Sequence, residues 1–302
     1  MNPKEPTGAT FTLGEDAWGE ARHRFSHEAM ASVFEVHCAH ADAAYAGQAA
    51  QAAFDVLDRL EREQSRFIAN SDISRINELP AGDRARVSPS TIECLVIARH
   101  LYDLSERAFD VTLGAGWERL ELVPDEFTVH AREAGARLDL GGIGKGYAVD
   151  RMAEVLREWD VSRALVHGGF SSVRILEAPS GQDGWALRLR APGRHDVLAR
   201  ILARHTAFGA SGTQKGAHIL DPRTGRAIAG REAAWVSVSA EGDPGDGLSP
   251  AAVADGLSTA FMILPPERVA ELCARHSELS AWLVPDSPEG EAPAVLHLPV
   301  SR

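Results

Sequence analysis

Apolar and polar positions along this chain repeat with different periods, and the changes of period predict both strands and helices. Residues 31–38 alternate between apolar and polar side chains, which is typical of a strand with one buried face. Residues 42–66 are rich in alanine and place Ala53, Leu57 and Leu60 on one stripe. This second segment therefore predicts a long amphipathic helix.

The rest of the chain predicts further helices and strands that do not alternate regularly. Ser88 is placed to cap a helix that opens with Pro89 and runs towards Arg107. This irregular order favours an α+β fold with mixed sheets and packed helices. Further helices are predicted at 150–159, 251–264 and 267–276, and strands at 164–169, 185–189, 197–202, 235–240 and 295–298, the last after a loop at 285–294.

Composition and charge narrow the class of protein. The chain has 302 residues, 44% of them hydrophobic, which is enough for a sizeable core, and a single domain is predicted over 23–302. The Pro, Gly and Thr residues near the N-terminus predict a flexible lead-in over 1–22. The formal charge of −12 argues against a protein that binds nucleic acid or an anionic membrane. The chain has no apolar run near the roughly 20 residues of a membrane span and no signal-peptide pattern, which predicts a cytoplasmic protein. Cys38, Cys94 and Cys273 are scattered and are expected to be buried free thiols.

The segment 138–150, which reads LDLGGIGKGYAVD, holds four glycines within six positions around Lys145. The glycine run lies between an apolar, strand-like segment and a helix-like segment, and a helix is predicted from Asp150. Glycine permits close approaches that a Cβ forbids, and the lysine adds a positive charge. Gly146 stands where a Walker A loop has Ser or Thr, and no βαβ unit with a downstream acidic residue is evident. Two interpretations stay open, a phosphate-binding loop and a turn that joins two packed elements.

Asp255 and Thr259 are four positions apart, so on a helix they share one face, with Ser258 beside them. A carboxylate and a hydroxyl on one face suit a hard divalent cation, which prefers oxygen ligands. The alternative is that Asp255 caps a helix and Thr259 is solvated.

His218 directly precedes a turn sequence, Asp-Pro-Arg-Thr-Gly at 221–225, and follows a Ser-Gly pair at 211–212. A lone histidine is more often structural than catalytic, so His218 needs support from other residues.

In the segment 108–112, Asp110 can serve as a turn or cap residue.

Taken in order, these segments resemble the FAD:protein FMN transferase family, the ApbE-type flavin transferases. The family pattern contains Met-Gly-Thr, Ser-x-Tyr/Phe, Phe-Asp-x-Thr-x-Gly, Asp-Leu-Gly-Gly-Ile-Ala-Lys-Gly-Tyr-Ala-x-Asp, Gly-Gly, Ser-Gly, His-Ile-Ile-Asp-Pro-x-Thr-Gly and Ala-Asp-Ala-x-x-Thr. The matching segments here are 30–32, 65–67, 109–114, 139–150, 168–169, 211–212, 218–225 and 254–259.

Three of the departures from the family pattern bear on the expected activity. Ala31-Ser32 stands where the pattern has Gly-Thr, which is a mild change. The segments 113–138 and 213–217 are shorter than is usual in the family. Both shortened segments are expected to reshape the side of the cleft that receives the acceptor protein.

The resemblance implies transfer of the FMN moiety of FAD to a Ser or Thr hydroxyl of a target flavoprotein, with release of AMP. It also implies Mg²⁺, held by Asp255, Thr259, the main-chain oxygen of Gly142 and Ser258, which are all oxygen ligands. His218 is the candidate general base, since an imidazole suits proton transfer near neutrality.

The resemblance further implies a set of FAD-contacting residues. Met30 and Phe67 map onto positions that line the flavin, although a methionine and an aromatic residue are more often core residues. The other mapped positions are Ala108, Phe109, Asp110, Asp139, Lys145 and Ile219.

Two other functions stay open at this point. An FAD pyrophosphatase would use the same metal site with water as the nucleophile, giving FMN and AMP. A non-catalytic FAD-binding protein would need neither His218 nor the pair of Asp255 and Thr259.

Overall fold

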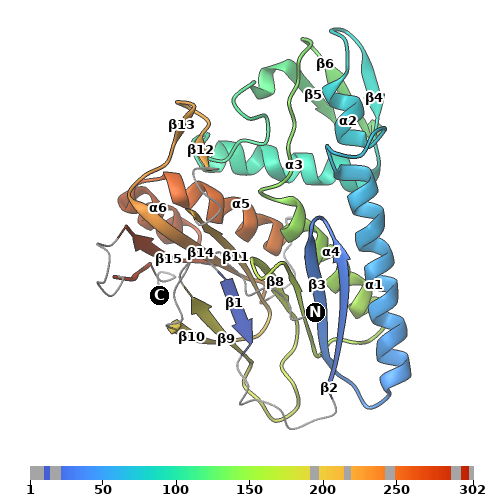
Figure 1. Cartoon of the computed structure of the whole chain (residues 1–302), viewed down its shortest axis with the longest axis vertical. Coiled ribbons are helices and arrows are strands. Elements are labelled where there is room, and N and C mark those ends of the chain that lie inside the picture. The colour runs from blue at the N-terminus through green and yellow to red at the C-terminus, as the bar shows by residue number, and fades with distance from the viewer. Residues whose placement is uncertain are drawn as a thin grey trace.

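An eight-stranded antiparallel sheet forms the centre of the computed structural model, which describes residues 10–13, 22–190, 197–213, 219–241, 249–286 and 294–298 (Figure 1). The helices are α1 (Ala43–Gln64), α2 (Asp72–Asn77), α3 (Pro89–Leu104), α4 (Gly144–Glu158), α5 (Pro250–Ile263) and α6 (Pro266–Arg275), with 3₁₀ turns η1 (Trp117–Arg119) and η2 (Pro124–Glu126). The strands are β1 (Thr10–Leu13), β2 (Arg22–Ala29), β3 (Ser32–Ala39), β4 (Arg84–Arg86), β5 (Leu120–Val123), β6 (Thr128–Ala131), β7 (Ala164–Gly168), β8 (Ser172–Ile175), β9 (Trp185–Arg190), β10 (Val197–Ala203), β11 (Thr206–Gly212), β12 (Leu220–Asp221), β13 (Arg226–Ala227), β14 (Arg231–Ser239), β15 (Leu279–Pro285) and β16 (Leu296–Leu298).

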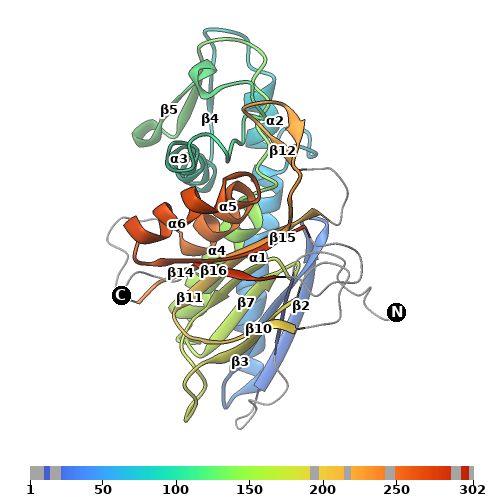
Figure 2. The same cartoon turned by 90° about the vertical axis from the view of Figure 1, so that its left-hand side faces the viewer.

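The large sheet has the strand order β16-β15-β14-β11-β8-β7-β3-β2, and both of its faces are covered. One face packs against α1, α4 and α5, while a second sheet of order β1-β9-β10 covers part of the other face (Figure 2). As a result, successive residues of β14 are buried on opposite faces of the sheet. Ala234 and Val236 belong to the core on the helix side. Ala233 and Trp235 belong to the core on the other side. This arrangement confirms the α+β prediction.

A smaller group of elements lies at one end of the molecule (Figure 1). It contains α2, α3 and a three-stranded sheet of order β4-β6-β5. The chain leaves this group through residues 132–143 and returns to the large sheet through α4. The predicted glycine segment therefore joins the two parts of the fold.

Most elements predicted from periodicity are present, with their ends shifted by a few residues. The Ser88 hydroxyl accepts the Thr91 N–H at 3.2 Å to cap α3, as predicted, and Asp42 caps α1. Cys38, Cys94 and Cys273 are free and buried, also as predicted. In the described part of the chain, no helix is long and apolar enough to cross a membrane.

The prediction around the glycine segment is wrong in two respects. Residues 138–140 are not a strand, and α4 begins at Gly144 rather than at Asp150. The reason is a contact from far along the sequence: the Asn77 side chain accepts the Leu138 N–H at 2.6 Å and donates to the Leu138 carbonyl at 3.0 Å. A side chain thus satisfies the backbone groups that a neighbouring strand would otherwise bind.

Within the predicted lead-in, the structure describes two segments. Residues 10–13 form β1, which pairs with β9, and Arg22 opens β2. The boundary between a lead-in and a domain stays a prediction.

The hairpin between β2 and β3 turns through two residues that both have positive φ. Ala29 pairs with Ser32, and the intervening Met30 and Ala31 have φ values of 50° and 53°. Two-residue turns of this kind favour glycine, because a Cβ is strained in the left-handed region.

We expect Ala31→Gly to raise the free energy of unfolding by about 0.5–1 kcal/mol, since it relieves that strain. Denaturant unfolding of the purified chain measures the change. Ala29→Gly is the matched control, because the same exchange inside the adjoining strand should lower stability. A loss of stability in Ala31→Gly would contradict the strain argument.

Candidate functional site

The second turn of α5 carries the predicted metal-ligating carboxylate. Asp255 lies five positions inside a helix that begins at Pro250, so the alternative that Asp255 is a helix cap is wrong. The side chain is buried, and its Oδ2 accepts the Gly146 N–H from α4 at 2.9 Å. Burial raises the pKa of the Asp255 carboxyl, while the charge of Lys145 and the Gly146 N–H act in the opposite direction.

Three hydroxyl groups lie together beside Asp255. Ser211, at the end of β11, has its Oγ 2.8 Å from Ser258 Oγ and 3.2 Å from Thr259 Oγ1. Ser258 is fully buried and donates to the Asp255 carbonyl at 2.8 Å, whereas Thr259 is only half-buried. Ser211 is absent from the predicted ligand set, although its Ser-Gly motif pointed to this region of the sequence.

Gly142 lies against the same group. A Cβ at Gly142 would lie 3.5 Å from Thr259 Oγ1 and 3.2 Å from Phe109 Cε2. The segment 142–146 therefore meets α5 at two points, Gly142 at Thr259 and Gly146 at Asp255, and the buried Phe109 ring lies beside Gly142. The donors are a carboxylate, a hydroxyl and main-chain oxygen, a set that fits a hard cation such as Mg²⁺.

Gly146, the last glycine of the segment 138–150, has a packing role that neither earlier interpretation included. A Cβ at Gly146 would lie 2.2 Å from the Ala251 carbonyl oxygen and 2.7 Å from Asp255 Cβ. From β11, a Cβ at Gly209 would lie 2.2 Å from the Ala254 carbonyl oxygen of the same helix. Helix α5 is thus contacted by bare backbone from two directions.

We expect Gly146→Ala to lower the free energy of unfolding by about 3 kcal/mol and to displace Asp255, because backbone atoms cannot yield as a flexible side chain can. Gly144→Ala is the matched control: a Cβ there meets only Leu140 Cβ, at 3.9 Å, and the family pattern has Ala at this position. Thermal unfolding of both variants makes the comparison. Equal stability of the two variants would contradict the proposed backbone contact.

The first turn of α5 is capped from α4 rather than by its own preceding residue. Ser249 makes no capping bond, and Asp150 Oδ2 instead accepts the N–H groups of Ala251 and Ala252 at 2.8 and 3.0 Å. Burial raises the pKa of the Asp150 carboxyl to about 7, against the opposing charge of Arg174, whose Nε lies 3.5 Å from Asp150 Oδ1. Asp150 therefore positions the helix that carries Asp255.

Asp139 is bound by an arginine that sequence reasoning did not include. The Nε atom of Arg66 lies 2.8 Å from Asp139 Oδ2, and its guanidinium carbon lies 4.2 Å from the centroid of the Phe67 ring. Phe67 is 80% exposed, so the alternative that it is a core residue is wrong. The signal for Arg66 was its place between the two motif residues Ser65 and Phe67.

Lys145 lies where three loops meet. Its Nζ is 3.5 Å from the Gly141 carbonyl oxygen, and a Cβ at Gly169 would lie 3.8 Å from Lys145 Cδ and 2.2 Å from Ser32 Oγ. The hairpin that carries Met30 therefore ends beside Lys145. Met30 itself is partly buried against the helix-side core, and its N–H donates to Glu61 Oε1 at 2.7 Å.

The Asp110 carboxylate stabilises its own loop. It accepts the Thr112 N–H and hydroxyl at 2.8 and 2.7 Å and the Gly114 N–H at 3.0 Å, as the turn alternative proposed. The preceding Ala108 is buried beneath this loop.

His218 lies outside the described residues, and its role as a general base stays a prediction. The next residue, Ile219, is buried and precedes the hairpin of β12 and β13. A Cβ at Gly114 would lie 3.1 Å from the Pro222 carbonyl oxygen, so this hairpin packs on the Asp110 loop.

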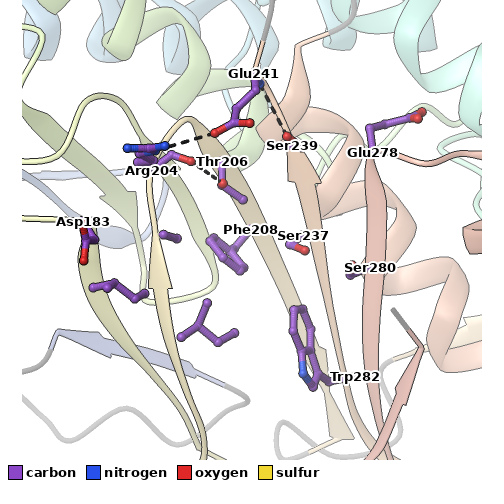
Figure 3. Close-up of a pocket in the computed structure, with 13 residues that line it drawn as sticks. Asp183, Arg204, Thr206, Phe208, Ser237, Ser239, Glu241, Glu278, Ser280 and Trp282 are labelled. Atoms are coloured by element: carbon purple, nitrogen blue, oxygen red, sulfur yellow. Dashed lines mark hydrogen bonds and ion pairs between the residues drawn. The ribbon is translucent and has the colours of Figure 1, made fainter. Parts of the chain in front are cut away.

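A separate cavity of about 560 Å³ lies between β10, β11, β14 and β15 (Figure 3). Phe208 and Trp282 form apolar parts of its wall, and the carboxylates of Asp183, Glu241 and Glu278 also line it. It contains none of the predicted site residues. We therefore separate it from the site around Asp255.

Comparison with known proteins finds relatives over most of the chain. The FAD:protein FMN transferase of Vibrio cholerae serotype O1 is 27% identical over 252 residues, covering 70% of this chain and 72% of that protein. The FAD:protein FMN transferase of Haemophilus influenzae is 24% identical over 274 residues, covering 76% of each. A solved structure, the flavin transferase ApbE from Vibrio cholerae, has a TM-score of 0.78 and 20% identity, covering 92% of this chain and 97% of that one, which shows a shared fold. The ApbE family matches residues 30–283, and because this match spans most of the sequence, the chain belongs to the ApbE family.

Proposed function

We propose that this protein transfers the FMN moiety of FAD to a Ser or Thr hydroxyl of a target protein, in a reaction that needs Mg²⁺ and releases AMP. The observation that carries the proposal is the convergence of Asp255, Thr259 and Gly142 beside Lys145. A buried carboxylate with neighbouring oxygen donors suits a magnesium ion on a pyrophosphate, and the lysine adds positive charge for the same anion.

Asp255, Thr259 and the main-chain oxygen of Gly142 would hold the ion, with Ser258 as a further candidate. When bound, Mg²⁺ would neutralise phosphate charge and stabilise the leaving AMP. The Ser258 hydroxyl is already engaged with Ser211 and with the Asp255 carbonyl, which favours a supporting role for it.

The flavin side of the proposed site uses apolar and cationic groups. The exposed Phe67 ring offers a flat apolar face, and Arg66 lies over it while pairing with Asp139. A planar, partly anionic ligand such as the FMN half of FAD matches this combination. Met30, at the tip of the neighbouring hairpin, supplies a further apolar contact.

In the proposed reaction, the acceptor hydroxyl oxygen forms a bond to the FMN-side phosphorus while the bond from that phosphorus to the AMP phosphate oxygen breaks. The hydroxyl proton passes to His218. We expect His218→Ala to lower turnover by about 10²–10⁴-fold. His100→Ala, which removes an exposed histidine of α3, is the control and should leave turnover unchanged. Unchanged turnover in His218→Ala would assign that histidine a structural role.

The deciding experiment measures AMP release from FAD and Mg²⁺ with and without a flavin-acceptor protein. AMP that appears only with the acceptor, together with covalent flavin on it, supports the transferase. AMP without acceptor would move the function to FAD hydrolysis. FAD binding without AMP in either reaction would leave a flavin-binding protein.

A further inference from the structure

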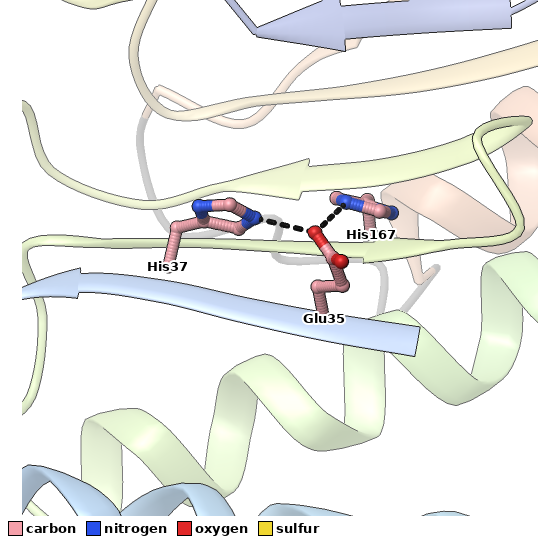
Figure 4. Close-up of side chains that lie close together, drawn as sticks. All are labelled: Glu35, His37 and His167. Carbon is pink, nitrogen blue, oxygen red and sulfur yellow. Dashed lines mark hydrogen bonds and ion pairs between the residues drawn. The ribbon is translucent and has the colours of Figure 1, made fainter. Parts of the chain in front are cut away.

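Glu35, His37 and His167 form a buried group on the face of the large sheet away from the helices (Figure 4). Their neighbours on β3, Phe34, Val36 and Cys38, point to the helix-side core, so Glu35 and His37 point the opposite way. The three residues are only 4–6% exposed.

The strand pairing explains why these side chains meet. Glu35 on β3 lies directly opposite His167 on β7, and His37 is two positions further along β3 on the same face. The Nε2 atoms of His37 and His167 lie 2.8 and 2.9 Å from the same oxygen, Glu35 Oε2. Sequence reasoning missed this group because its members converge only in this register.

The donor atoms suit a transition metal rather than Mg²⁺. Two imidazole nitrogens and a carboxylate oxygen are a ligand set that Zn²⁺ commonly takes, with a fourth position open. The three atoms lie within 4.8 Å of one another. Tetrahedral ligands at 2.0–2.2 Å from zinc are about 3.4 Å apart, so shifts of the donor atoms relative to one another by at most about 1.4 Å would complete the site.

A neighbouring arginine supplies part of the hydrogen bonding that orients the ligands of such a site. Arg24 Nε donates to the other oxygen, Glu35 Oε1, at 3.0 Å, which leaves Oε2 for an ion. The Arg24 side chain is 63% exposed, so solvent weakens its repulsion of a cation. The Nδ1 atom of His167 is buried and has no hydrogen-bond partner. The hydrogen-bonded trio therefore leaves one of its buried polar atoms unsatisfied.

We propose that Glu35, His37 and His167 bind a divalent transition metal, of which Zn²⁺ is the best fit, at a site distinct from the Asp255 site. The ion would tie β3 to β7 close to the place where both strands reach the proposed flavin site. There, the Gly169 N–H already donates to the Val33 carbonyl at 2.9 Å.

The test is calorimetric titration of the metal-free full-length chain with Zn²⁺ in excess Mg²⁺, which occupies hard-oxygen sites. We expect one Zn²⁺ per chain, with affinity at least about 10-fold lower in both His37→Ala and His167→Ala. Two variants are controls that should keep the affinity for Zn²⁺. His27→Ala removes a histidine of β2 that pairs with Asp58 of α1, and Asp255→Asn alters the separate magnesium site. Full zinc binding in the double variant His37→Ala/His167→Ala would overturn the proposal.

Absorption spectroscopy of the unaltered protein with Co²⁺ keeps the proposal testable if the histidine variants fail to fold. We expect the intense visible bands of four-coordinate cobalt. These bands should disappear when Zn²⁺ displaces Co²⁺ and should persist when Mg²⁺ is added. Weak bands of six-coordinate cobalt alone, or no binding of either ion, would overturn the proposal.

Discussion

Asp255→Asn should lower Mg²⁺-dependent AMP release by about 10³-fold, which corresponds to about 4 kcal/mol of lost transition-state stabilisation. Asparagine is nearly the same shape and still accepts the Gly146 N–H that Asp255 accepts at 2.9 Å. Only the buried negative charge is lost, so the fold should survive while the affinity for Mg²⁺ falls.

Steady-state turnover at several Mg²⁺ concentrations, with circular dichroism to check folding, measures this effect. Asp103→Asn is the matched control, because it makes the same exchange at an exposed position of α3 and should leave turnover unchanged. Full activity in a folded Asp255→Asn variant would remove Asp255 from the metal site.

Asp150→Ala should lower the free energy of unfolding by about 3 kcal/mol, as large a loss as that expected for Gly146→Ala. It removes the acceptor of two N–H groups at the start of α5 and leaves the buried Arg174 without its opposite charge. Asp150→Asn should lose less, because its amide oxygen can still accept from Ala251 and Ala252.

Denaturant unfolding monitored by far-UV circular dichroism makes this comparison. Glu158→Ala, at an exposed position near the end of the same helix, should change stability by no more than about 0.5 kcal/mol. If Asp150→Ala were as stable as Glu158→Ala, the hydrogen bonds from Asp150 to the start of α5 would not contribute to the stability of the fold.

The long helices and the central strands could be predicted because their patterns are local. The alanine stripe of α1 and the Ser88 cap of α3 are each visible in a short window of sequence. The three-residue strand β4, with the burial pattern exposed-buried-exposed, is too short to show a period. The irregular path at Leu138 depends on Asn77, which no window around Leu138 contains.

In the candidate site too, contacts between residues close in sequence could be predicted, whereas contacts between distant segments could not. Asp255 and Thr259 share a helix face, so their spacing was enough to predict that they lie together. The pairing of Arg66 with Asp139 and the contact of Ser211 with Thr259 each join different parts of the fold. The group of Glu35, His37 and His167 requires the register of β3 against β7, which periodicity does not supply.

The two glycine contacts on α5 also determine how this protein can be redesigned. Gly146 and Gly209 meet the backbone of α5 directly. At these two contacts, the position of the helix therefore does not depend on the size of a packed side chain. Changes of size elsewhere in the core should therefore leave Asp255 nearly in place, even where they lower stability. Ligand preference is thus open to directed evolution at the hairpin tip and at Phe67, while positions 146 and 209 should reject every residue larger than glycine.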